Sequence, residues 1–176
     1  LEERGFLDSG DIDRQIDEFL AGGSPANGAR ITARAWVDRG FKERLLADAS
    51  AAIREVGLSM VGGIQEQRLK VVANSETEHH VIVCTLCSCY PVALLGPSPS
   101  WYKSEAYRSR VVRDPRGVLR EFGLELPPDM QITVWDASAE SRYMVLPGRP
   151  VDTAGMSEAD LAGLVTRKGL IGTAAV

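Results

Sequence analysis

The three cysteines of this chain all fall within six of its 176 residues, as Cys84, Cys87 and Cys89. The apolar run Val81–Val83 precedes them and predicts a buried strand, and Pro91 ends regular structure shortly afterwards. The cysteines are therefore expected on a tight loop that follows a rigid element. Such a loop is suited to a metal ion, because the element before it fixes the positions of the ligands.

The spacing of Cys87 and Cys89 places two peptide nitrogens, those of Ser88 and Cys89, between two thiolates. If both amides lost their protons, two sulfurs and two nitrogens could lie in one plane around a metal. Cys84 could then add an axial thiolate and leave a sixth position open. Soft thiolates select transition metals over magnesium or calcium. Deprotonation of backbone amides needs a strong Lewis acid, such as trivalent cobalt or iron.

Three other interpretations of the cysteines stay open on spacing alone. A structural zinc site normally uses four side-chain ligands, so here it would need His79 or His80 in a cramped arrangement. Cys84 and Cys87 also have the spacing of a thiol redox pair, but that motif usually opens a helix and needs no third cysteine. The last alternative is three inert core cysteines. Their clustering favours the metal site, and the histidines are expected to be strand-entry residues with ordinary hydrogen bonds.

Composition excludes several classes of function. The formal net charge of −4 and the pI of about 5.3 give no electrostatic support for nucleic-acid binding. No apolar run approaches the roughly 20 residues that a membrane span needs. An odd number of cysteines in one cluster argues against a secreted disulfide scaffold. Because no signal peptide is visible, a cytoplasmic location is expected.

Hydrophobic periodicity divides the chain into an arm and a domain. Residues 1–28 are expected to form an N-terminal helical arm, with a helix over residues 9–21 and a linker over residues 21–28. The arm packs either on a partner or back on its own domain. Residues 29–176 are expected to form the metal-binding domain. Its expected helices lie at 29–38, 41–56, 101–113, 114–123 and from 157 onward, with Leu161, Leu164 and Val165 buried; its expected strands lie at 69–73, 81–83, 131–135 and 142–146.

The segment Cys84-Thr85-Leu86-Cys87-Ser88-Cys89-Tyr90-Pro91 resembles the metal-binding motif of nitrile hydratase alpha subunits, which the related thiocyanate hydrolase shares. Further similar segments bring the resemblance to nearly the whole chain: 33–38, 101–103, 106–113 and 142–147. In that family Thr85 and Tyr90 accompany cobalt, whereas the iron type usually carries Ser and Thr at these positions. The resemblance therefore implies trivalent cobalt (Co3+) in preference to iron. It also implies an α+β fold with layers in the order α-β-β-α.

The resemblance also implies a reaction and a set of partners. The chain would be the metal-bearing subunit of an enzyme that hydrates a nitrile to an amide. It would act with a beta subunit of one or two chains, after an activator protein has inserted the metal. The implied metal ligands are Cys84, Cys87, Ser88 and Cys89. Cys87 would become a sulfinate and Cys89 a sulfenate, and arginines of the beta subunit would neutralise their charge.

Four further residues receive roles by resemblance. Gln65 is expected near the substrate, and Asp136, Glu140 and Arg142 in a hydrogen-bond network around the metal. The implied catalytic residues are Cys87, Ser88, Cys89, Gln65 and Arg142. Thiocyanate hydrolysis and a non-catalytic zinc-binding interaction subunit are the alternatives.

One position departs from the family pattern. Many members carry Trp directly after the Tyr-Pro of the motif, and Val92 stands there in this chain. Loss of a large aromatic wall predicts a roomier pocket for bulky, heteroaromatic nitriles, with the nucleoside nitrile toyocamycin as one candidate.

Overall fold

The computed structural model describes residues 14, 17, 22–60, 67–87 and 89–176. The helix expected over residues 9–21 lies almost entirely outside these residues, and the arm over residues 1–28 stays a prediction. No helix in the described part of the chain is long and apolar enough to cross a membrane.

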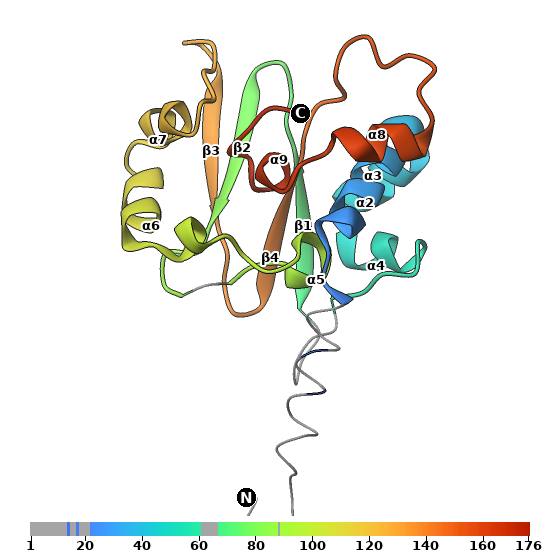
Figure 1. Cartoon of the computed structure of the whole chain (residues 1–176), viewed down its shortest axis with the longest axis horizontal. Helices are drawn as coiled ribbons and strands as arrows, with labels where there is room; N and C mark the ends of the chain where they lie inside the picture. Colours follow the sequence, from blue (N-terminus) through green and yellow to red (C-terminus); the bar gives the residue numbers. More distant parts are fainter. Residues whose placement is uncertain (1–13, 15–16, 18–21, 61–66, 88) are drawn as a thin grey trace, which may run out of the picture.

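The described residues include four strands, which form two parallel pairs. They are β1 (Arg68–Ala73) with β4 (Ser141–Leu146), and β2 (Glu78–Val83) with β3 (Gln131–Asp136). The C-terminal ends of β2 and β3 lie at the same end of the molecule as the N-terminal ends of β1 and β4 (Figure 1). The four strands that the sequence predicts are all present. Three of them are one residue longer than expected, whereas β2 begins three residues earlier, at Glu78, and so includes both histidines.

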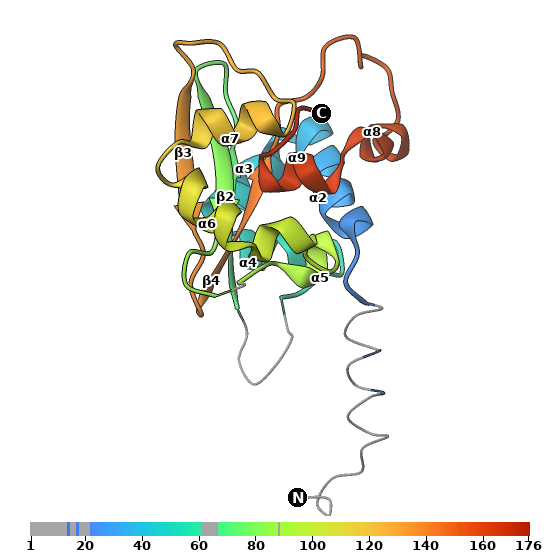
Figure 2. The ribbon, with the colours of Figure 1, turned by 60° about the vertical axis from the view of Figure 1, so that its left-hand side comes forward.

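Helices cover the strands on two sides. They are α2 (Pro25–Val37), α3 (Arg39–Ala47), α4 (Ala49–Arg54), α5 (Val92–Leu95), the 3-10 helix η2 (Ser100–Lys103), α6 (Glu105–Val111), α7 (Pro115–Glu121), α8 (Glu158–Leu164) and α9 (Arg167–Ile171). Figure 1 shows α6 and α7 on one side of the strands and α2, α3, α4 and α8 on the other. Helices α5 and α9 pack against α2 (Figure 2). The expected α+β class is confirmed.

The prediction of one helix over residues 41–56 is wrong, because the chain is interrupted at Asp48. The Asp48 carboxylate accepts a hydrogen bond from the backbone N of Ala51 at 3.0 Å and starts α4 as its N-cap. The apolar side chains on either side of this break remain in the core: Leu45, Ala49, Ala52 and Ile53 are buried.

Other features of the helices also differ from the sequence prediction. The helix expected over 101–113 is divided at Ser104, whose hydroxyl accepts from Tyr107 N at 3.2 Å and caps α6. Helix α2 begins at Pro25, inside the expected linker, because Ser24 caps it and proline suits the first helical position. Leu164, expected to be buried, is exposed, and the short helix α9 was not predicted.

The two histidines join β2 to the residue after α9 and to the neighbouring strand β3. His79 Nε2 donates to the Gly172 carbonyl at 2.8 Å, and His80 Nδ1 accepts from Trp135 Nε1 at 3.1 Å. Gly172 has a φ of +88°, and a Cβ there would collide with the His80 carbonyl oxygen. The histidines therefore make the ordinary hydrogen bonds that the sequence predicts.

Candidate metal centre

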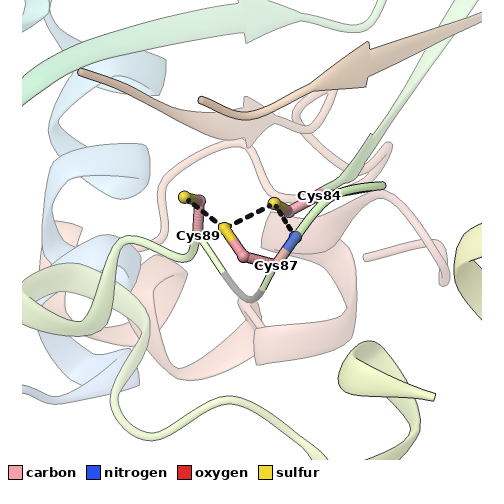
Figure 3. A group of neighbouring side chains, drawn as sticks. All are labelled: Cys84, Cys87 and Cys89. Carbon is pink, nitrogen blue, oxygen red and sulfur yellow. Dashed lines mark hydrogen bonds between the residues drawn. The ribbon is translucent and has the colours of Figure 1, made fainter. Parts of the chain in front are cut away.

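The cysteine loop (residues 84–89) follows β2 directly and brings its three thiols together. The Sγ atoms of Cys84 and Cys87 are 3.2 Å apart, and those of Cys87 and Cys89 are 3.0 Å apart. All three Sγ atoms lie within 4.8 Å of one another. Figure 3 shows the Cys87 sulfur between the other two, with Cys87 N donating to Cys84 Sγ at 3.3 Å. One loop thus presents three sulfur ligands to one point.

Burial differs among the three thiols, and it affects the protonation of Cys89. Cys84 is 1% exposed and Cys89 9%, whereas Cys87 is exposed. Burial, followed by the hydrogen bond from Cys87, raises the pKa of the Cys89 thiol to about 12, against the opposing charge of Arg142. The Cys89 thiol of the metal-free loop is therefore protonated at neutral pH. A cation that binds there must displace its proton, because the thiolate is the form that ligates a metal.

The first half of the cysteine loop is fastened to the end of β3. The Asp136 carboxylate accepts from Thr85 N at 2.9 Å and from Thr85 Oγ1 at 2.5 Å. Strand pairing places Val83 opposite Asp136, and Ala137 N donates to the Val83 carbonyl at 2.7 Å. Asp136 therefore contacts the loop, as its expected role requires, although the role itself stays a prediction.

The rest of the cysteine loop is held by residues that the sequence analysis did not assign to the site. Tyr102 Oη donates to the Cys89 carbonyl at 3.1 Å, and Arg108 Nη1 donates to the Cys87 carbonyl at 3.3 Å. Tyr107 Oη donates to the Ile82 carbonyl, just before the loop, at 2.7 Å. Burial raises the pKa of both tyrosines, so each hydroxyl remains a donor at ordinary pH. The aromatic and basic composition of residues 101–113 was visible in the sequence, but it does not reveal which carbonyls these side chains reach.

Arg142 and Glu140 differ in their relation to the cysteine loop. Arg142 is 8% exposed, and its Nη1 donates to the carbonyls of Ser138 and Ala139. Its positive charge opposes the rise in the pKa of the Cys89 thiol. Glu140 is exposed, and its backbone carbonyl accepts from Arg68 N at 2.9 Å. Its backbone N donates to Ser138 Oγ at 3.3 Å, so the hydrogen bonds of Glu140 to described residues use its main chain, and its expected role in the network stays a prediction.

Three other predicted site residues are placed in part or not at all. Gln65 and Ser88 lie outside the described residues. Val92 is half-buried at the start of α5, where a Cβ on Gly23 would lie 3.1 Å from Val92 Cγ1. The Val92 side chain therefore faces the segment that precedes α2.

The donor set fits a thiophilic transition metal. Among the described residues, the three cysteines form the group of potential ligands, with no imidazole or carboxylate in it. His79 and His80 are already hydrogen-bonded to Gly172 and Trp135, which disfavours a four-ligand zinc site built with either ring. The sulfur separations also exceed the roughly 2.05 Å of a disulfide, and all three cysteines are free.

Comparison with known proteins gives the same family as the sequence of the cysteine loop. The family model of the nitrile hydratase alpha chain matches residues 1–174. The chain belongs to the nitrile hydratase alpha-chain family. It is 52% identical over 172 residues to the low-molecular-weight cobalt-containing nitrile hydratase subunit alpha of Rhodococcus rhodochrous, covering 98% of this chain and 82% of that protein.

Two further relatives show the breadth of the family. The thiocyanate hydrolase gamma subunit of Thiobacillus thioparus is 43% identical, over 98% of this chain and 74% of its own length. A solved structure of a mutant Fe-type nitrile hydratase from Comamonas testosteroni superposes with a TM-score of 0.91 at 41% identity, over 99% of this chain and 84% of that chain. Members of this family therefore differ in metal and in substrate while keeping one fold.

Proposed function

We propose that this chain is the metal-bearing subunit of a cobalt nitrile hydratase, which adds water to R–CN and forms R–CONH2. The observation that supports this most strongly is the convergence of three Sγ atoms within 4.8 Å on one loop. The sequence of the loop, with Thr85 and Tyr90, and the cobalt-containing relatives favour cobalt over iron.

The residues that would hold the metal are Cys84, Cys87 and Cys89, together with the backbone nitrogens of Ser88 and Cys89. When bound, trivalent cobalt would supply a Lewis acid that polarises the nitrile without a change of oxidation state. The exposure of Cys87 leaves the loop open on one side for a substrate. Cys84, buried at the end of β2, would stay an unmodified thiolate.

The remaining chemistry would come from side chains of this chain. Once Cys87 and Cys89 ligate the metal as thiolates, an external oxidant such as molecular oxygen would convert Cys87 to a sulfinate and Cys89 to a sulfenate. The sulfenate oxygen of Cys89 would either attack the nitrile carbon or accept a proton from the attacking water. The Arg142 charge, which already acts on Cys89, would stabilise the negative charge that accumulates there. Gln65 and Glu140 keep their proposed places near the substrate and in the surrounding network.

A partner chain would complete the site. Leu86 is 91% exposed although it stands between Cys84 and Cys87, and Cys87 itself is exposed. An apolar side chain and an oxidised, negatively charged cysteine both gain from being covered by a partner that offers apolar surface and cationic donors. We therefore assign this face to a beta subunit of one or two chains, docked after an activator protein has inserted the metal.

The deciding experiment uses this chain co-expressed with its beta subunit in cobalt-supplemented medium. Metal analysis should give about one cobalt per chain, and mass spectrometry of the peptide 81–91 should show added oxygen on Cys87 and Cys89. Nitrile hydration should be present in the complex and lost in Cys89→Ser. Zinc bound to unmodified cysteines would contradict the proposal.

Thiocyanate hydrolysis is the second candidate, because the thiocyanate hydrolase gamma subunit is 43% identical over nearly the whole chain. Parallel assays with a nitrile and with thiocyanate separate the two activities. Turnover of thiocyanate with no turnover of the nitrile would replace the first candidate by the second.

A further inference from the structure

Three side chains from one short stretch, residues 102–108, donate hydrogen bonds to main-chain carbonyls of the cysteine loop and of the residue pair before it. Tyr107 reaches the Ile82 carbonyl at 2.7 Å, Arg108 the Cys87 carbonyl at 3.3 Å and Tyr102 the Cys89 carbonyl at 3.1 Å. The two tyrosines thus hold the chain before the first cysteine and at the last one. The arginine holds it between them.

The tyrosine hydroxyls have little freedom to move. Tyr102 is 1% exposed and Tyr107 4%, and their ring centroids are 5.8 Å apart. Trp101 packs edge-on against Tyr107 at 4.9 Å between ring centroids, and Phe122 lies 4.6 Å from Trp101. Tyr90, directly after the last cysteine, packs edge-on against Tyr102 at 4.9 Å. Interlocked rings of this kind fix each hydroxyl relative to the other.

Hydrogen bonds to the main-chain carbonyls of the loop determine its shape more directly than contacts with the loop's own side chains would. A main-chain carbonyl fixes the orientation of its peptide plane, and the peptide planes set where each Sγ and each amide nitrogen points. A ligand loop that already has its binding shape loses less conformational freedom when the metal enters.

We propose that Tyr102 and Tyr107 are positioning residues that hold the two ends of the cysteine loop in its metal-binding shape, with Arg108 holding the middle. This inference rests on the proposed metal-binding function and adds the residues that prepare the loop for its ion. The alternative is that both tyrosines only fill the core, in which case their rings matter and their hydroxyls do not.

The test removes the hydroxyls and leaves the rings. Tyr102→Phe and Tyr107→Phe are made in the complex with the beta subunit, and the matched control is Tyr143→Phe. The Tyr143 ring stacks on Trp135 at 5.3 Å between centroids, and its hydroxyl has no hydrogen bond to a residue that the structure describes. Cobalt per chain is measured over a series of limiting cobalt concentrations. The visible absorption of the metal–thiolate centre, kcat and KM for a nitrile are measured on the same samples.

Each Phe variant should raise the cobalt concentration for half-loading by about fivefold, which corresponds to one net buried hydrogen bond. Each should also shift the absorption band and lower kcat more than it changes KM, while Tyr143→Phe behaves as the unmodified complex. Loading and absorption equal to the control would overturn the proposal, even with a lower thermal midpoint. If a Phe variant does not fold, Arg108→Ala, at a half-buried position, gives the same comparison.

Failure of the proposed function has a different signature. An unmodified complex that binds cobalt without hydrating any nitrile refutes nitrile hydration, and the loading comparison still decides on the tyrosines. An unmodified complex that binds no cobalt refutes both.

Discussion

The contact between Thr85 and Asp136 makes a quantitative prediction about how the cysteine loop is held. Asp136 accepts two hydrogen bonds from Thr85, through the backbone N and through Oγ1. Hydrogen bonds to a charged group are worth about 1.5–3 kcal/mol when buried. Because Asp136 is exposed and Thr85 half-buried, competition with water should reduce the side-chain bond to about 1 kcal/mol.

Thr85→Val removes the hydroxyl and keeps the shape of the side chain. It should lower the thermal midpoint of the metal-free complex by about 2–4 °C, the shift that about 1 kcal/mol produces in a domain of this size. Asp136→Ala loses both bonds and should cost about twice as much. Thr85→Ser keeps the hydroxyl and is the control, with an expected change under about 0.5 kcal/mol.

The assay is a double-mutant cycle on the thermal midpoint, measured by scanning calorimetry at one ionic strength. Once Asp136 is replaced by Ala, the further change Thr85→Val should have almost no effect, because the acceptor is already gone. Full additivity of the two losses would refute the reasoning, since it would mean that the two side chains contribute independently.

Three further perturbations test other parts of the structure. Gly172→Ala should destabilise the protein by more than about 3 kcal/mol, because Gly172 has a positive φ and a Cβ there meets the His80 carbonyl; expression yield and thermal midpoint report it. Burial lowers the pKa of His79 and of His80. The unfolded chain therefore takes up protons first as pH falls through about 6.5. Stability should be full above that pH and decline below it, and His79→Gln should reduce the difference between midpoints at pH 7.5 and pH 5.5. Val92→Trp should lower kcat/KM for bulky nitriles by about tenfold or more and spare small ones; an equal loss for both would contradict the pocket argument.

Local signals in the sequence were sufficient to locate the strands and the cysteine cluster. Alternation and apolar runs predicted all four strands, because a buried strand must present β-branched and apolar side chains. The clustering of Cys84, Cys87 and Cys89 predicted a metal loop, and the structure brings their sulfurs together.

The errors in the predicted helices arise because a polar side chain can cap a new helix instead of continuing the one before it. Asp48 and Ser104 both interrupt segments whose periodicity favours one continuous helix, since their side chains cap the next helix instead. The sequence contains both residues, but periodicity alone does not tell whether such a residue lies on a solvated face or starts a new helix.

Long-range contacts around the cysteine loop were beyond local patterns. The hydrogen bond from Tyr102 to Cys89 depends on where η2 packs, and the bond from Tyr107 to Ile82 depends on where α6 packs. Asp136 was assigned by resemblance, and its contact with Thr85 follows from the parallel pairing of β2 with β3. The hydrophobic periodicity of β2 or of β3 does not specify which strand it pairs with.

The pairing of β2 with β3 also constrains when the site can form during synthesis. Thr85 and Asp136 are 51 positions apart, so the cysteines leave the ribosome well before the strand that holds their loop. Until β3 has been translated and docked, the thiols belong to an unfinished segment, and premature capture of an ion would fix the wrong geometry. Under the proposed function, an ion that arrives after β3 has docked would meet the cysteine loop in its finished shape.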